Sequence, residues 1–139
     1  MVDGVAWPDR TLTQLEDEDW GEPTYPSYVV TNSHRLRNKL LREFTAEDLR
    51  FMLGQQISLP VLMPMALDVL DADPFAGGDM YEGALLNMAV RVNPKFWRDH
   101  PTLWYRMNMV LLVVRQFHEL LEQDVFPAVT AFEAARPEG

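Results

Sequence analysis

Apolar residues recur at steps of three and four along most of the chain, the spacing that places side chains on one face of an α-helix. The longest such series lies near the C-terminus and predicts a helix of about five turns. Its members are Leu103, Met107, Val110, Leu111, Val114, Phe117 and Leu121. Pro127 then predicts a separate short helix over residues 128–135, because proline fits a first helical turn. No segment alternates apolar and polar residues between turns, so the pattern predicts an all-α fold.

Capping signals predict where the first helix and the turn after it lie. Thr11 can cap a short helix that runs to Glu16, and Thr13 and Glu16 have the spacing of a capping box. The charged stretch that follows contains Trp20 and Gly21. We expect a packed turn there, with the Trp20 side chain buried and Gly21 in the left-handed conformation that glycine adopts without strain.

Two further helices are predicted in the middle of the chain. Thr45 is a strong N-cap because acidic residues follow it, and Phe44 and Leu49 are placed to staple the helix start. Pro60 fits the first turn of the next helix, while Pro64 indicates either a later start or a kink. Apolar residues fill nearly all sides of that helix, which we therefore expect to be central. They are Val61, Leu62, Met65, Leu67, Val69 and Leu70.

Length and composition indicate one domain. The chain has 139 residues, of which 47% are apolar and 11% aromatic, and this content suffices for one hydrophobic core. We expect a compact single-domain bundle of about six to eight helices over residues 1–139. Its ends, residues 1–10 and 136–139, are expected to be flexible.

The sequence also bears on the compartment. The absence of cysteine excludes a disulfide framework, a thiolate nucleophile and cysteine-ligated metal centres. No basic region followed by an apolar stretch opens the chain, so we expect no secretory signal. The apolar segments 57–67 and 107–114 are shorter than the ~20 residues that span a bilayer. We therefore expect a cytoplasmic protein without a membrane partner.

The net charge of −9 is distributed in blocks. Residues 1–22 carry seven acids against one base, and residues 51–90 carry five acids and no base. Residues 91–118 carry five arginines and lysines with one acid, after which an acidic tail begins at Glu119. A net basic face is required for phosphate backbones, so nucleic acid is excluded as the expected partner and a basic protein is favoured.

No motif in the sequence predicts catalysis or a cofactor. His34, His100 and His118 are far apart, and no serine lies in a Gly-x-Ser-x-Gly elbow. His118 and Glu122 share a helix face, which is typical of a solvated surface. The spacing of Asp68, Asp71 and Asp73 permits a cation site but lacks the remaining ligands of a calcium loop. We predict no enzyme, no metal and no cofactor, while a carboxylate-based enzyme stays an alternative.

Several ordered motifs nevertheless resemble one known family, the immunity proteins of bacterial contact-dependent growth inhibition (CDI) systems. The resemblance extends over residues 11 to 105 or thereabouts. The motifs are residues 12–16 (LTQLE), 19–23 (DWGEP), 44–50 (FTAEDLR), 54–59 (GQQISL), 63–67 (MPMAL), 78–86 (GDMYEGALL) and 96–97 (FW).

The resemblance implies a cytoplasmic antidote that binds the toxic C-terminal domain of a large exported effector protein. Such toxins are often nucleases, whose basic cleft an acidic helical surface can occupy. We expect the contacts to come from exposed acids and a neighbouring aromatic residue, with a solvated acidic face as the alternative. They are Asp68, Asp71, Asp73, Asp79, Tyr81 and Glu82. The alternative function is that of a helical adaptor protein without a toxin partner.

Overall fold

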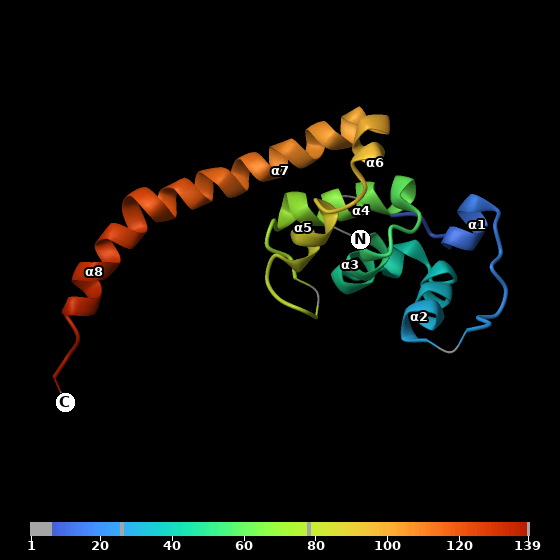
Figure 1. The fold of residues 1–139 in the computed structure, drawn as a ribbon, viewed down its shortest axis with the longest axis horizontal. Helices are drawn as coiled ribbons and strands as arrows, with labels where there is room; N and C mark the ends of the chain where they lie inside the picture. Colours follow the sequence, from blue (N-terminus) through green and yellow to red (C-terminus); the bar gives the residue numbers. More distant parts are fainter. Residues whose placement is uncertain (1–6, 26, 78, 139) are drawn as a thin grey trace.

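The computed structural model describes residues 7–25, 27–77 and 79–138, and every regular element in this part of the chain is helical. Figure 1 shows their arrangement. The elements are α1 (Leu12–Glu16), α2 (Tyr28–Arg37), the 3₁₀ turn η1 (Leu41–Glu43), α3 (Ala46–Gly54), α4 (Leu59–Ala72), α5 (Ala84–Ala89), α6 (Pro94–Asp99), α7 (Pro101–Leu120), the π turn η2 (Leu121–Val125) and α8 (Phe126–Ala134). The predicted all-α fold with a long helix near the C-terminus is confirmed.

Helix α4 lies at the centre of the fold, as its apolar sequence predicts. It packs against α3, α5 and α7, and the side chains of Leu62, Met63 and Leu67 are completely buried. The helix begins at Leu59 and continues through Pro64, so Pro64 does not mark a later start. Pro60 occupies the first turn, where its missing N–H removes no helical hydrogen bond.

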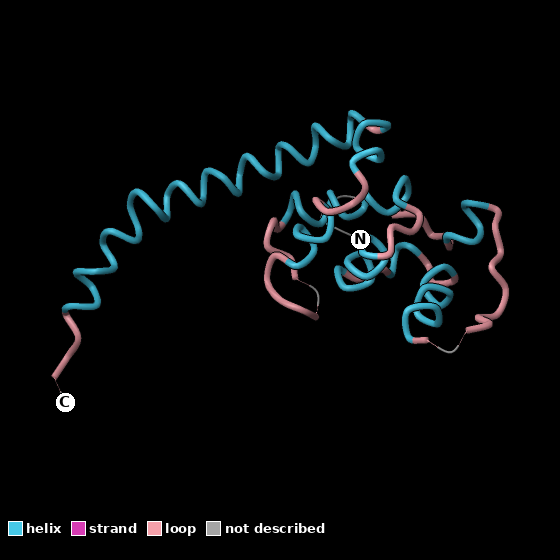
Figure 2. The backbone as a smooth tube through the Cα atoms, in the orientation of Figure 1, coloured by secondary structure: helices cyan, strands magenta, loops and turns pink. Residues whose placement is uncertain are grey.

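Helix α7 starts on this body and then leaves it (Figures 1 and 2). Met107 and Val110 are buried against the body, whereas no described side chain from residue 115 to residue 138 is buried. The apolar series that predicts this helix is therefore covered only over its first part. We call residues 115–134 the helical arm, because this part of the helix projects from the body (Figure 2).

The prediction that Pro127 starts a separate helix is wrong. α7, η2 and α8 form one continuous helix, in which the Phe126 N–H bonds to the Leu121 carbonyl five residues earlier. Proline lacks an N–H and its ring crowds the carbonyl four residues before it. The wider π turn accommodates both effects, so the chain passes Pro127 without ending the helix.

A capping box begins α1, although with different residues from those predicted. The Gln14 N–H donates to the Thr11 hydroxyl at 3.1 Å, and the Thr11 N–H donates to the Gln14 side-chain oxygen at 2.9 Å. Thr13 lies inside the helix, where its hydroxyl donates to the Arg37 carbonyl at 3.2 Å. The pairing of Thr13 with Glu16 is therefore wrong, because a tertiary contact to α2 occupies Thr13.

Arg37, near the end of α2, fixes the turn after α1. Its guanidinium is buried and donates to Glu16 at 2.5 Å, to Ser58 at 3.2 Å and to the Glu18 carbonyl at 2.8 Å. It also lies 4.5 Å from the centre of the Trp20 ring. Trp20 is 39% exposed, so its predicted burial is wrong, because it covers Arg37 from the solvent side. Gly21 has the predicted positive φ, at 67°.

Candidate binding surface

The six residues predicted to contact a partner fall into two groups. Asp68 and Asp71 lie on α4, whereas Asp73, Asp79, Tyr81 and Glu82 lie between α4 and α5. We call residues 73–77 and 79–83 the acidic loop. The two groups differ in whether their carboxylates bind other side chains of the fold.

Asp68 and Asp71 bind α7 rather than being left open to a partner. The Arg106 guanidinium donates to Asp68 at 3.0 Å and to Asp71 at 2.9 Å, and the Trp7 indole N–H donates to Asp68 at 2.9 Å. Burial lowers the pKa of Arg106, but the hydrogen bonds to both carboxylates outweigh it and raise the pKa above its ordinary value. Asp68 is half-buried, which corrects its expected place among the exposed acids.

The acidic loop keeps its charges in solvent. The side chains of Asp73, Asp79 and Glu82 are exposed, and Asp79 and Glu82 form no ion pair within the described residues. Met80 and Tyr81 are 61% and 54% exposed beside them. Carboxylates next to an exposed methionine and tyrosine are a combination that protein interfaces favour.

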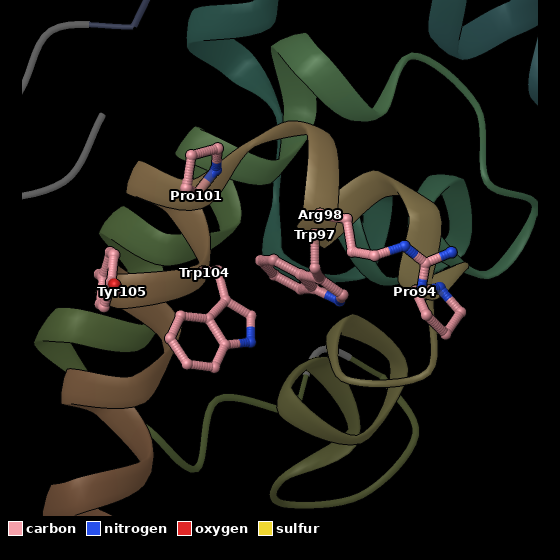
Figure 3. A pocket seen from close by; sticks show the side chains of 6 residues that line it. All are labelled: Pro94, Trp97, Arg98, Pro101, Trp104 and Tyr105. Atoms are coloured by element: carbon pink, nitrogen blue, oxygen red, sulfur yellow. The ribbon is translucent and has the colours of Figure 1, made fainter.

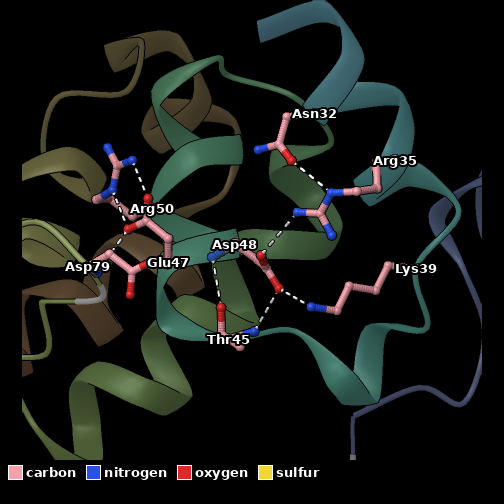
Figure 4. Close-up of polar contacts among 8 residues, drawn as sticks. All are labelled: Asn32, Arg35, Lys39, Thr45, Glu47, Asp48, Arg50 and Asp79. Carbon is pink, nitrogen blue, oxygen red and sulfur yellow. Dashed lines mark hydrogen bonds and ion pairs between the residues drawn. The ribbon is translucent and has the colours of Figure 1, made fainter. Parts of the chain in front are cut away.

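Backbone contacts give the acidic loop a defined shape. The Gly83 N–H donates to the Phe75 carbonyl at 2.8 Å, which closes the loop on itself. A Cβ on Gly77 would lie 2.2 Å from the Tyr81 carbonyl oxygen, so only glycine permits this close approach. The Asp79 N–H donates to Glu47 on α3 at 3.2 Å (Figure 4). These contacts within the loop and to α3 thus hold the exposed acids in defined positions.

The carboxylates of α3 are paired with bases (Figure 4). Glu47 accepts from Arg50 at 2.8 and 2.5 Å, and Asp48 accepts from Lys39 at 2.6 Å and lies 3.8 Å from Arg35. The hydrogen bond from Arg50 lowers the pKa of Glu47, whereas a general acid needs a raised pKa. Glu47, Asp48 and Arg35 border an open hollow of about 450 Å³. The pairing of both carboxylates with bases indicates a structural role.

An aromatic cleft at the start of α7 was not predicted (Figure 3). Its volume is about 450 Å³, and the indoles of Trp97 and Trp104 lie on its wall. The lining residues are Pro94, Trp97, Arg98, Pro101, Trp104 and Tyr105. Pro94 and Pro101 indicate in the sequence where α6 and α7 start. The sequence does not give the angle between the two helices, and this angle brings the aromatic rings together. Phe75 and Met80 were also missed, although apolar residues among loop acids are a recognisable signal.

Residues 7–25, 27–77 and 79–138 contain no candidate metal site and no candidate membrane-spanning helix. No group of three or more histidine and carboxylate side chains there could hold a metal ion. The His118 Nε2 atom lies 3.4 Å from a Glu122 carboxylate oxygen on the surface where α7 continues into η2. No helix in the same residues combines the length and the apolar character needed to cross a bilayer.

Comparison with known proteins identifies one family. A family model of CDI immunity proteins matches residues 14–107, which is more than half of the chain and includes the acidic loop. No curated protein and no solved structure matches the chain. The family match confirms the resemblance that the ordered motifs indicate.

Proposed function

We propose that this chain, which belongs to the family of CDI immunity proteins, neutralises its cognate toxin by direct binding through the acidic loop. The family makes the chain an immunity protein with a CDI toxin as its partner. The surface and the mechanism are our inference. The observation that carries it is the exposure of Asp79 and Glu82, which have no base opposite them within the described fold.

A direct occlusion mechanism fits the charge and the shape of the acidic loop. A nuclease toxin binds phosphate through a basic cleft, so a protruding acidic loop can enter that cleft and exclude the substrate. Met80 and Tyr81 supply the apolar contacts that charge alone does not provide. Complementary charge also speeds capture, toward ~10⁸ M⁻¹s⁻¹ at low salt.

Binding without catalysis is favoured over a carboxylate-based enzyme. Where a shift of a carboxyl pKa is resolved, at Glu47 and Asp99, hydrogen bonds from neighbouring bases lower the pKa. A carboxyl group acting as general acid would need burial that raises the pKa. We therefore propose that the chain acts as a cytoplasmic antidote with a surface rather than an active site.

Growth rescue tests the function. The cognate toxin domain should arrest growth when produced alone, and co-production of this chain should restore growth and yield a stable complex. The proposed function would be contradicted if growth stays arrested although the folded chain is abundant in the cells, and if purified chain and toxin form no complex.

Charge reversal tests the surface. The variant with Asp79→Lys and Glu82→Lys should bind the toxin about ten- to hundredfold more slowly at low salt, with a flatter dependence of the association rate on salt. Glu22→Lys is the matched control, because Glu22 is also exposed but lies in the connection between α1 and α2 at the far side of the body. Stopped-flow fluorescence measures the rates. Equal rates for the loop variant and the control would place the interface elsewhere, with the toxin partnership intact.

A further inference from the structure

The helical arm continues the apolar face with which α7 packs on the body. Val110 is buried against the body. At 100° per residue, Phe117 and Leu121 lie within about 20° of Val110, two and three turns further along the helix. The ring centre of Phe117 lies 5.6 Å from that of Phe75 in the acidic loop, so this face is turned toward the body. Phe117 is nevertheless 45% exposed, because the body covers the face no further.

The π turn η2 keeps the same face apolar as the helix passes Pro127. The Phe126 N–H bonds to the Leu121 carbonyl, so Phe126 lies one turn beyond Leu121 along the helix axis. Val129 follows three residues later, and none of these side chains is buried. We call Phe117, Leu121, Phe126 and Val129 the inner strip. It extends about 18 Å at 1.5 Å of rise per residue.

The inner strip and the acidic loop are joined by the aromatic pair of Phe117 and Phe75. Phe75 is 41% exposed, and the acidic loop adds the exposed side chains of Met80 and Tyr81. Monomeric proteins seldom expose contiguous apolar patches beyond a few hundred Å², and aromatic residues and methionine are enriched in protein interfaces. A partner bound to the acidic loop therefore meets the inner strip across this aromatic pair.

The charge of the arm indicates a basic partner. Residues 119–133 carry four acids and no base. The acidic loop next to the arm exposes Asp73, Asp79 and Glu82. A second copy of this chain, with its net charge of −9, would add like charge, whereas a basic protein meets complementary charge at both places.

The acidic loop alone is too small for a stable interface. A standard interface uses about 20–30 residues and ~800 Å² from each partner, whereas the loop is limited to residues 73–77 and 79–83. A domain of about 100 residues has a radius of gyration of about 13 Å, so one such domain can contact the loop and the inner strip together. The arm also curves toward the side on which the body lies (Figure 1).

We propose that the inner strip forms the second half of the toxin-binding surface, beside the acidic loop. This inference rests on the proposed function, because it takes the cognate toxin as the partner. The two halves contribute differently. The charges of the loop speed association, whereas the apolar contacts of the inner strip slow dissociation.

The dissociation rate of the complex tests the role of the inner strip. The variant with Leu121→Gln and Val129→Gln removes apolar contacts without changing the charge. It should dissociate from the purified cognate toxin domain about ten- to hundredfold faster, with an association rate changed less than about threefold. Leu112→Gln is the matched control, because Leu112 is 44% exposed on the opposite face of α7, and it should leave dissociation unchanged. Biolayer interferometry measures both rates, and circular dichroism checks that each variant is folded.

Hydrogen exchange of the full chain locates the contact. Amides of residues 115–134 should gain protection when the toxin domain is added. Equal dissociation rates for the double variant and the control, or no added protection in a complex that forms, would overturn the role of the strip and leave the proposed function standing. Protection that rises with the concentration of the chain alone would also overturn it and assign the strip to a second copy. A wild-type chain that forms no complex would overturn the proposed function together with this inference.

Discussion

Replacing Arg37 by alanine should remove a large part of the folding free energy, because its buried guanidinium joins three segments. It bonds to Glu16 in α1, to the Glu18 carbonyl in the following turn and to Ser58 at the start of α4. Only 2% of its surface is exposed. The Arg37 Nε atom has no hydrogen-bond partner, so the network is incomplete.

The magnitude follows from the partners that are lost. A hydrogen bond between charged groups contributes about 1.5–3 kcal/mol and a neutral one about 1 kcal/mol, while breaking a buried pair costs about 3–5 kcal/mol. Glu16 is 27% exposed at its side chain and can regain water, and the unpaired Nε already weakens the network. We therefore expect Arg37→Ala to lower the free energy of unfolding by about 3 kcal/mol, within a total of about 5–15 kcal/mol.

Urea unfolding followed by circular dichroism and tryptophan fluorescence measures the loss. Glu16→Gln, which keeps a hydrogen-bond acceptor, should lower the free energy of unfolding by about 1 kcal/mol. Arg35→Ala is the matched control on the same helix, with a side chain 56% exposed, and should change it by less than about 1 kcal/mol. If Arg37→Ala and Arg35→Ala destabilise equally, the buried guanidinium does not anchor the turn and the reasoning is refuted.

Three further predictions concern the α3 cap, the pair of Glu47 with Arg50, and Gly77. Thr45→Ala removes the α3 cap and should lower the free energy of unfolding by about 1 kcal/mol in urea titrations; an unchanged value would contradict the capping role. Arg50 lowers the pKa of Glu47, so the stability that this pair contributes is present above about pH 4.5 and is lost as the pH falls through the lowered pKa. The stability difference between wild type and Glu47→Gln should therefore shrink on acidification, while Asp99→Asn, at an exposed pair, should have little effect at any pH. Gly77→Ala should displace the acidic loop and slow toxin capture with a loss of about 1–3 kcal/mol in stability; crystals with the loop unmoved would refute the steric argument.

Some features of this protein follow from short stretches of sequence. The caps at Thr11 and Thr45, the first-turn position of Pro60 and the left-handed Gly21 all depend on residues within one helical turn. Periodic apolar positions likewise suffice to predict the central place of α4 and the length of α7. The family resemblance is also carried by short ordered motifs, which lie within the matched residues almost throughout.

Other features depend on residues far apart in the chain. Asp68 is half-buried because Arg106, which is 38 positions away, pairs with it, and Trp20 is exposed because it covers Arg37. The acidic block therefore separates into carboxylates that hold α7 and carboxylates of the acidic loop that face solvent. Pairing of this kind depends on where helices cross, which helical periodicity does not specify.

The sequence by itself determined which segments are helical, which faces are apolar and which family the motifs resemble, because these properties are local or nearly so. Only the tertiary structure decided which acids stay unpaired and how far the body covers the long helix. An apolar helix face predicts a packing partner, but the sequence does not say which element supplies it. In α7 the body buries Met107 and Val110 near the start of the helix, and from residue 115 onward it buries no described side chain.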